Sequence, residues 1–133
     1  MDFHSRHKLL ILSHSTEIYR EMGRMVAAIK EKPIEAFLDA YEERFMAALS
    51  LKSTVAKHAN VLQHILGYFK KALSSDEKQE MLEVIDRFRQ GLVPLIVPVT
   101  LVNHYVRKYA EPYLAGQFYL NPHPVELKLR NHV

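Results

Sequence analysis

The sequence predicts an all-α fold, a single compact domain over residues 1–133 built as a bundle of about six helices with an extended C-terminal arm. Apolar residues recur at intervals of three and four along most of the chain, which is the period of a helix with one buried face. Serine caps and first-turn prolines separate these periodic segments. Because 48% of the residues are hydrophobic, a chain of this length can bury one core.

Local signals separate the first three helices. Residues 3–12 form the first periodic segment, and residues 13–15 offer a break and a serine N-cap for a second helix over residues 16–29. Pro33 suits the first turn of a third helix, because its fixed φ is helical and its missing N–H is not needed there. Helical spacing of apolar residues continues through residues 34–49.

Capping signals also place the next three helices. Ser53 is a candidate cap for a fourth helix over residues 55–73. The letters SSDE then form a capping-box pattern, in which Ser74 precedes a glutamate by three residues, and they open a fifth helix that ends near Gly91. A sixth helix is expected over residues 94–110.

The last residues, about 118–133, are expected to form the arm. Two prolines in this stretch bias the residues before them away from helix. Beyond Pro124, apolar and charged residues alternate, which fits a strand-like arm, although a short helix starting at Pro124 is an alternative.

The charged residues are grouped rather than scattered. Acidic residues gather in two blocks, residues 31–43 and 76–86, and the stretches that follow each block carry Lys and Arg but no acid until Asp76 and Glu111. With a net charge of +3, a folded bundle could present a positive face to an anionic partner, whereas evenly solvated charge is the alternative.

The fourth helix has two chemically different sides. Unrolled at about 100° per residue, it places His58 among apolar residues, so His58 is predicted to be a histidine at the edge of the core. Gly67 costs about 1 kcal/mol relative to alanine in a helix, so we expect a neighbouring helix or a ligand to approach its backbone. The polar side carries Lys57, Asn60, His64, Gly67, Tyr68 and Lys71.

The sixth and first helices repeat this combination of residues. The sixth carries Thr100, Asn103, His104 and Arg107 opposite its apolar stripe. The first carries His4, Arg6, His7 and Lys8 within five residues. Because three helices each present histidine together with Lys or Arg, we hypothesise that they form one basic, histidine-bearing face.

Four segments resemble the YbgA-like domain of bacteria: RHKLLILSH, NVLQHILGYFKK, GLVPLIVPVTLVNHYV and YLAGQFYLNPHPVELKLRNHV. Members of that family occur alone or behind a thiouracil-desulfidase-like domain, and the fused proteins are implicated in removing sulfur from 4-thiouridine in tRNA. The resemblance therefore implies RNA recognition, with tRNA as the expected RNA and a desulfidase-like protein as a possible partner. Family positions map onto Arg6, His7, Lys8, His14, Asn60, His64, Gly67, Tyr68, His104, Gln117, Pro122, Leu127, Arg130 and Asn131.

Together, the helix patterns and the resemblance predict an accessory domain that binds RNA. Lys and Arg would contact phosphates, His and Asn would bond sugars or base edges, and Tyr68 would stack on an unpaired base. No catalytic residue, metal or cofactor is expected, and a chain without cysteine has no thiolate chemistry. The expected RNA-binding residues are Arg6, His7, Lys8, His14, Lys57, Asn60, His64, Tyr68, Lys71, Asn103, His104, Arg107, Arg130 and Asn131.

Two other classes of function stay open. A small enzyme would use His64 or His104 beside an acid such as Glu111, or a metal held by three histidines of the N-terminal region, although no His-Glu-x-x-His pattern is present. The series Glu35, Asp39 and Glu43 is interpreted as solvated surface. A protein-docking module would instead use the regions of Met25, Tyr113 and Phe118.

The expected location is the cytoplasm. No segment approaches the roughly 18 consecutive apolar residues that a membrane span needs. The polar start of the chain also predicts no secretory signal.

Overall fold

The computed structural model describes residues 1–122, and every regular element within that range is a helix. This confirms the predicted all-α class. The elements are α1 (Asp2–His14), α2 (Thr16–Ala27), the 3-10 helix η1 (Ile29–Glu31), α3 (Ile34–Ser50), α4 (Val55–Tyr68), α5 (Ser75–Arg89), α6 (Ile96–Tyr109), α7 (Pro112–Ala115) and the 3-10 helix η2 (Phe118–Leu120). Within this range, no helix is long and apolar enough to cross a membrane.

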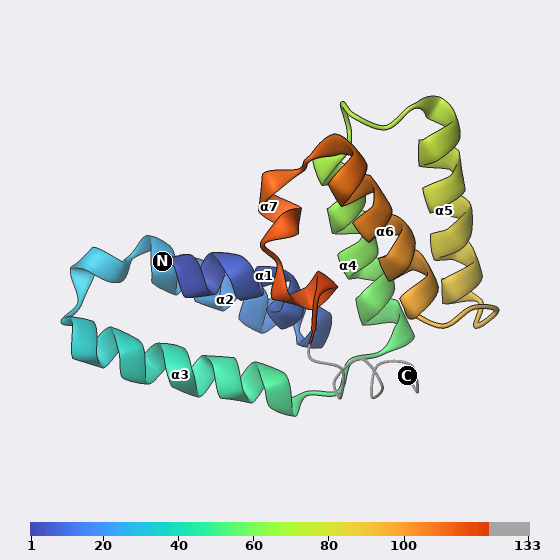
Figure 1. Cartoon of the computed structure of the whole chain (residues 1–133). Helices are drawn as coiled ribbons and strands as arrows, with labels where there is room; N and C mark the ends of the chain where they lie inside the picture. The colour runs from blue at the N-terminus through green and yellow to red at the C-terminus, as the bar shows by residue number, and fades with distance from the viewer. Residues whose placement is uncertain (123–133) are drawn as a thin grey trace.

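The helices form two packed groups (Figure 1). In one group, α1, α2 and α3 pack on one another around Ile11, Met22 and Phe37. In the other, α5 packs on both α4 and α6, and the first group lies crosswise to these three helices. Helix α1 joins the groups, because it contacts α4 and η2 as well as α2 and α3.

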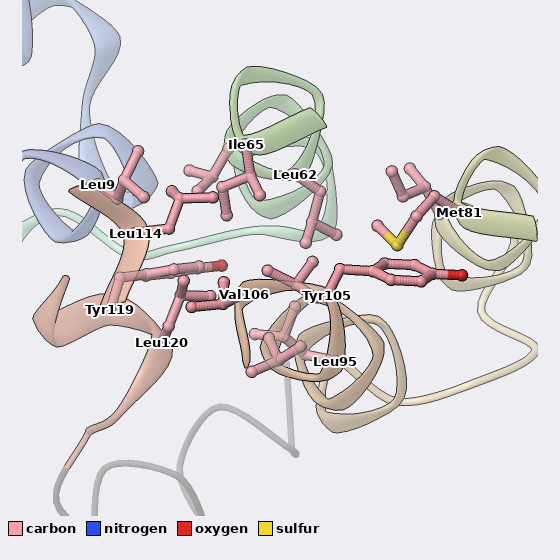
Figure 2. Packing of buried hydrophobic residues seen from close by; sticks show 14 of the residues in the cluster. Leu9, Leu62, Ile65, Met81, Leu95, Tyr105, Val106, Leu114, Tyr119 and Leu120 are labelled. Carbon is pink, nitrogen blue, oxygen red and sulfur yellow. The ribbon is translucent and has the colours of Figure 1, made fainter. Parts of the chain in front are cut away.

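The larger core lies between α4, α5 and α6 and is closed by the end of the described chain. Figure 2 shows Leu62 and Ile65 of α4 facing Tyr105 and Val106 of α6, with Met81 of α5 beside them. Each fully buried side chain of this kind contributes about 1.5–3 kcal/mol relative to an exposed one. Leu9, Leu114, Tyr119 and Leu120 complete the core on the side of α1.

Helix starts follow the predicted caps more closely than helix ends do. Ser15 accepts a hydrogen bond from the amide of Ile18, and Ser74 forms the predicted capping box with Glu77. The fourth helix differs, because Thr54 caps it rather than Ser53, and it ends at Tyr68 rather than residue 73. Residues 69–73 form hydrogen-bonded turns, and Phe69 and Leu73 still pack on the core. The apolar spacing in the sequence therefore continues beyond the last residue of the helix, which is why the predicted end was too late.

The expectation of an arm from residue 118 is wrong for its first residues. Phe118–Leu120 forms a 3-10 turn against α1, and both Tyr119 and Leu120 are buried. The prolines restrict only the residues that directly precede them, so burial of the apolar side chains decides the conformation before residue 121. The rest of the predicted arm, residues 123–133, lies outside the described residues together with Arg130 and Asn131.

Candidate functional site

Helix α4 has the buried and exposed sides expected from its sequence. His58 is buried, and its Nδ1 lies 2.6 Å from the hydroxyl of Tyr119. This confirms that His58 is a core histidine. The predicted RNA-binding residues on the other side are fully or partly exposed: Lys57, Asn60, His64, Tyr68 and, just beyond the helix, Lys71.

Four aromatic side chains from three helices gather beside α4. The ring of Tyr68 stacks on that of Tyr113 in α7, with centroids 4.6 Å apart and planes inclined by 16°. The ring of His64 makes an edge contact with Tyr19 of α2 at a centroid distance of 6.4 Å. We call Tyr19, His64, Tyr68 and Tyr113 the Tyr68 cluster. Since α2 and α7 hold the outer two tyrosines, tertiary packing rather than α4 alone positions this cluster.

The Tyr68 cluster offers a partly exposed aromatic surface. Tyr68 is 45% exposed, whereas Tyr19 and Tyr113 are half-buried. Burial raises the pKa of Tyr113, and the neighbouring Tyr68 raises it further. Burial likewise raises the pKa of Tyr19, again with a smaller contribution from Tyr68. The open face of the Tyr68 ring can therefore receive a planar group while the ring beneath it stays fixed.

The sequence suggested that either a neighbouring helix or a ligand approaches the backbone of Gly67, and the structure excludes the neighbouring helix within the described residues. No other part of the described chain lies within 4 Å of a Cβ atom built at Gly67. A neighbouring helix therefore does not account for this glycine, because it faces open space at the end of α4. Gly67 and Asn60 line cavities between α4 and α5, whereas His64 and Tyr68 contact α2 and α7. The polar side predicted for α4 is thus divided between two surfaces.

Among residues 1–122, no hydrogen bond or ring contact joins the predicted residues of α6 to the Tyr68 cluster. Asn103 donates a hydrogen bond from Nδ2 to the carbonyl of Leu120 at 3.0 Å, which ties α6 to η2. His104 and Arg107 are exposed. His104 lies roughly 160° around α6 from the buried Val106, so it points away from the core that α6 shares with α4. No ring contact within residues 1–122 joins His104 to His64.

In α1, His7 belongs to an aromatic stack. Its ring stacks on Phe3 at 4.0 Å and on Phe118 at 5.3 Å, and its Nδ1 donates to the carbonyl of Phe3 at 2.7 Å. Arg6 is exposed beside this stack, and both residues line a cavity of about 370 Å³ with Gln117 and Phe118. Lys8 is partly exposed on the same helix.

The two remaining histidines of the N-terminal region hold the fold together. His4 is buried between α1 and α3, with its Nδ1 3.0 Å from the hydroxyl of Tyr41. Burial, and then the charge of Lys8, lower the pKa of His4 to about 4. His14 donates from Nδ1 to the carbonyl of Leu51 at 2.7 Å. Among residues 1–122, no group of three His, Asp or Glu side chains is arranged to hold a metal ion.

Gln117 is a residue whose structural role the sequence did not indicate. Its side chain is buried, its Oε1 accepts from the amide of Leu9 at 3.3 Å, and its Nε2 donates to the carbonyl of Ser5 at 2.5 Å. Ser5 and Leu9 are four residues apart, so one amide clamps a full turn of α1. The partners are backbone atoms more than a hundred residues away in sequence, and no sequence motif marks them.

The acids named in the enzyme alternative have other roles in the described structure. Glu111 caps α7, because its Oε2 accepts from the amide of Leu114 at 2.6 Å. Glu35, Asp39 and Glu43 are exposed on α3, as predicted for solvated surface. Met25, one of the suggested docking residues, lines a cavity of about 280 Å³ between α2 and α3.

Comparison with known proteins places the chain in a family. The family model described as "Protein of unknown function (DUF1722)" matches residues 8–124. The chain is 36% identical over 132 residues to "Uncharacterized protein YbgA" of Escherichia coli (strain K12), covering 98% of this chain and 78% of that protein. No solved structure matches the chain significantly. With a family model over most of its length and a relative at this identity, the chain belongs to the YbgA-like DUF1722 family.

Proposed function

We propose that this domain binds RNA through the Tyr68 cluster together with the cations Lys57, Lys71 and Arg107, as an accessory domain for an enzyme that acts on tRNA. The observation that carries the proposal is the exposed ring of Tyr68, held from below by Tyr113. An exposed aromatic ring with a fixed orientation is a platform on which an unpaired base can stack, a contact of about 1–3 kcal/mol.

Unpaired cations supply the electrostatic part of the proposal. Among residues 1–122, the ion pairs use only Arg6, Arg44 and Lys108 as cations. Lys71 and Arg107 have no acidic partner there, and Lys57 donates only to the carbonyl of Lys52, which leaves its charge uncompensated. Cations without acidic partners can release phosphate counterions on binding, which makes the affinity fall with salt.

The platform and the charges make separable contributions. Stacking releases no counterions, so loss of the Tyr68 ring should weaken the binding of unpaired bases without changing the salt dependence. Tyr68→Ala removes the ring, and Tyr68→Phe is the matched control that keeps it while removing the hydroxyl.

Fluorescence anisotropy with a labelled RNA hairpin that carries unpaired loop bases, and with a blunt RNA duplex, tests the platform. We expect Tyr68→Ala to lose about 5-fold or more in affinity for the hairpin and little for the duplex, with Tyr68→Phe close to wild type. Equal losses for hairpin and duplex, or no loss for the hairpin, would remove the platform from the proposal.

A further inference from the structure

A groove runs along the outer side of α4 and α5, away from the Tyr68 cluster. Two cavities of about 230 and 510 Å³ lie between these helices, and Gln63 lines both, so they are neighbours along α4. Gly67 leaves part of the wall of the smaller cavity without a side chain, and nothing else in the described chain enters that space. The apolar side chains that line the two cavities are Val55, Ala56, Ala59, Leu66, Phe69 and Leu73. We call the surface formed by the two neighbouring cavities the α4–α5 groove.

The edges of the α4–α5 groove are basic. Lys70 and Lys78 border its smaller cavity, and Arg89 borders the larger one. None of these cations takes part in an ion pair within residues 1–122. An apolar floor between unpaired cations suits an acidic amphipathic helix better than a nucleic-acid strand. The one ring that lines the floor, Phe69, is only 1% exposed and offers no stacking face, and an apolar floor would desolvate phosphates.

The exposed side of α3 has the complementary chemistry. Ile34, Leu38 and Met46 are 58%, 48% and 58% exposed on it. At about 100° per residue, Glu35 and Asp39 fall among and beside these apolar residues on the same side. Neither acid forms an ion pair within the described part of the chain. Helix α3 is therefore an acidic amphipathic helix with part of its apolar surface uncovered.

We propose that α3 of one copy of this chain docks into the α4–α5 groove of a second copy. The apolar residues of α3 span twelve residue steps, about 18 Å, and the residues of α4 that line the groove, from Val55 to Gly67, span the same distance. The absent side chain of Gly67 lets the backbone of the docked helix approach closely. Since α3 and α5 lie at opposite ends of the molecule, α3 does not reach the groove of its own copy (Figure 1).

The proposed contact joins two different surfaces, so it is heterologous. A heterologous contact generates a closed ring or an open chain of copies rather than a two-fold dimer. The association should also weaken as salt rises, because opposite charges border its two sides.

Analytical ultracentrifugation of the full chain, over rising protein concentration and at low and high salt, tests the proposal. We expect the weight-average mass of the wild type to rise above the monomer mass at low salt. The double variant Lys78→Glu, Arg89→Glu has acidic residues both at the groove and on α3, so its copies should repel one another. The double variant Glu35→Lys, Asp39→Lys has basic residues on both surfaces, with the same result. Each double variant alone should stay monomeric, and an equimolar mixture of the two should associate again.

Circular dichroism melting of each double variant is the control for folding. Arg20→Glu with Arg24→Glu, at exposed positions of α2, is the control for charge reversal outside the two proposed surfaces. A wild type that stays monomeric, an association that survives either double variant, or a mixture that stays monomeric would overturn the proposal. Unchanged self-association with loss of RNA binding in the Lys78→Glu, Arg89→Glu variant would assign the groove to RNA instead.

Discussion

The ring of Tyr68 lies on the ring of Tyr113, with centroids 4.6 Å apart. The two residues are far apart in sequence, and α7 holds Tyr113 because Glu111 caps that short helix and Leu114 is buried in the core. The orientation of the exposed ring therefore depends on the packing of the chain end onto α1 and α4.

Gln117→Leu should lower the free energy of unfolding by about 1–3 kcal/mol. The substitution removes the clamp on α1 and leaves the backbone partners of Gln117, the Ser5 carbonyl and the Leu9 amide, with fewer hydrogen bonds in a buried place. Urea denaturation of wild type and variant measures the change. Gln63→Leu, at an exposed glutamine, is the matched control and should stay within about 0.5 kcal/mol. Equal effects of the two substitutions would contradict the clamp.

His4 should make stability depend on pH between about 6.5 and 4. Its pKa is about 4 in the folded chain and about 6.5 when unfolded, so the unfolded state binds more protons in this window. The free energy of unfolding should therefore fall as the pH falls, by up to about 1.4 kcal/mol per pH unit from this residue.

Urea denaturation at several pH values measures the contribution of His4. His4→Gln should flatten the dependence in this window, because glutamine does not titrate. His104→Gln is the control, since that histidine is exposed, and it should keep the wild-type slope. A slope that survives His4→Gln would assign the dependence to another group.

Glu77→Gln should lower the melting temperature and weaken its dependence on acid. Glu77 joins α5 to α6 through Lys108 at 2.7 Å and the hydroxyl of Tyr109, in addition to its capping bond with Ser74. The Lys108 bond, followed by those of Tyr109 and Ser74, lowers the pKa of Glu77 to about 2. A carboxylate with a lowered pKa stabilises the fold above about pH 4.5, and this contribution is lost as the pH falls toward 2.

Calorimetry at pH 7 and at several acidic pH values measures the effect of Glu77→Gln. Glu83→Gln is the matched control on the same helix, because Glu83 is exposed and its side chain accepts a hydrogen bond only from Gln79 among the described residues. The account of the α5–α6 contact fails if both variants melt alike at pH 7.

Two glycines should respond to alanine in opposite directions. Gly67→Ala should raise the free energy of unfolding by up to about 1 kcal/mol, because alanine favours helix and meets nothing there. Gly91→Ala should lower it by about 1 kcal/mol, because Gly91 ends α5 with a φ of 79° that alanine adopts only with strain. Urea denaturation of both variants decides the matter, and a destabilised Gly67→Ala would reveal a contact at that position.

Much of the fold follows from local sequence signals. The capping box at Ser74, the serine cap at residue 15 and the core position of His58 are all as predicted, because each depends on residues within one or two helical turns. The amphipathic period likewise identifies the α4 side chains that enter the core.

The roles of several candidate site residues depend on parts of the chain that are distant in sequence, so they could not be predicted. His14 bonds the carbonyl of Leu51, Asn103 bonds that of Leu120, and His7 stacks on Phe118. In the sequence, each of these polar residues could equally be a ligand-binding residue. Only the folded structure shows that its partner lies within the chain itself. The same limit explains why the expected arm begins as a buried 3-10 turn.

The most direct test of RNA binding is the salt dependence of the affinity for a labelled tRNA. The measurement compares wild type with the triple variant Lys57→Ala, Lys71→Ala and Arg107→Ala by fluorescence anisotropy between about 50 and 200 mM salt. Lys30→Ala with Lys32→Ala is the control for loss of charge, at exposed positions near the start of α3. We predict that the wild type binds with an affinity that falls with salt, and that the triple variant binds more weakly, with a log–log slope shallower by somewhat under one unit per lost contact. A wild type without salt-dependent affinity for tRNA, or a triple variant that binds as the wild type does, would contradict the account.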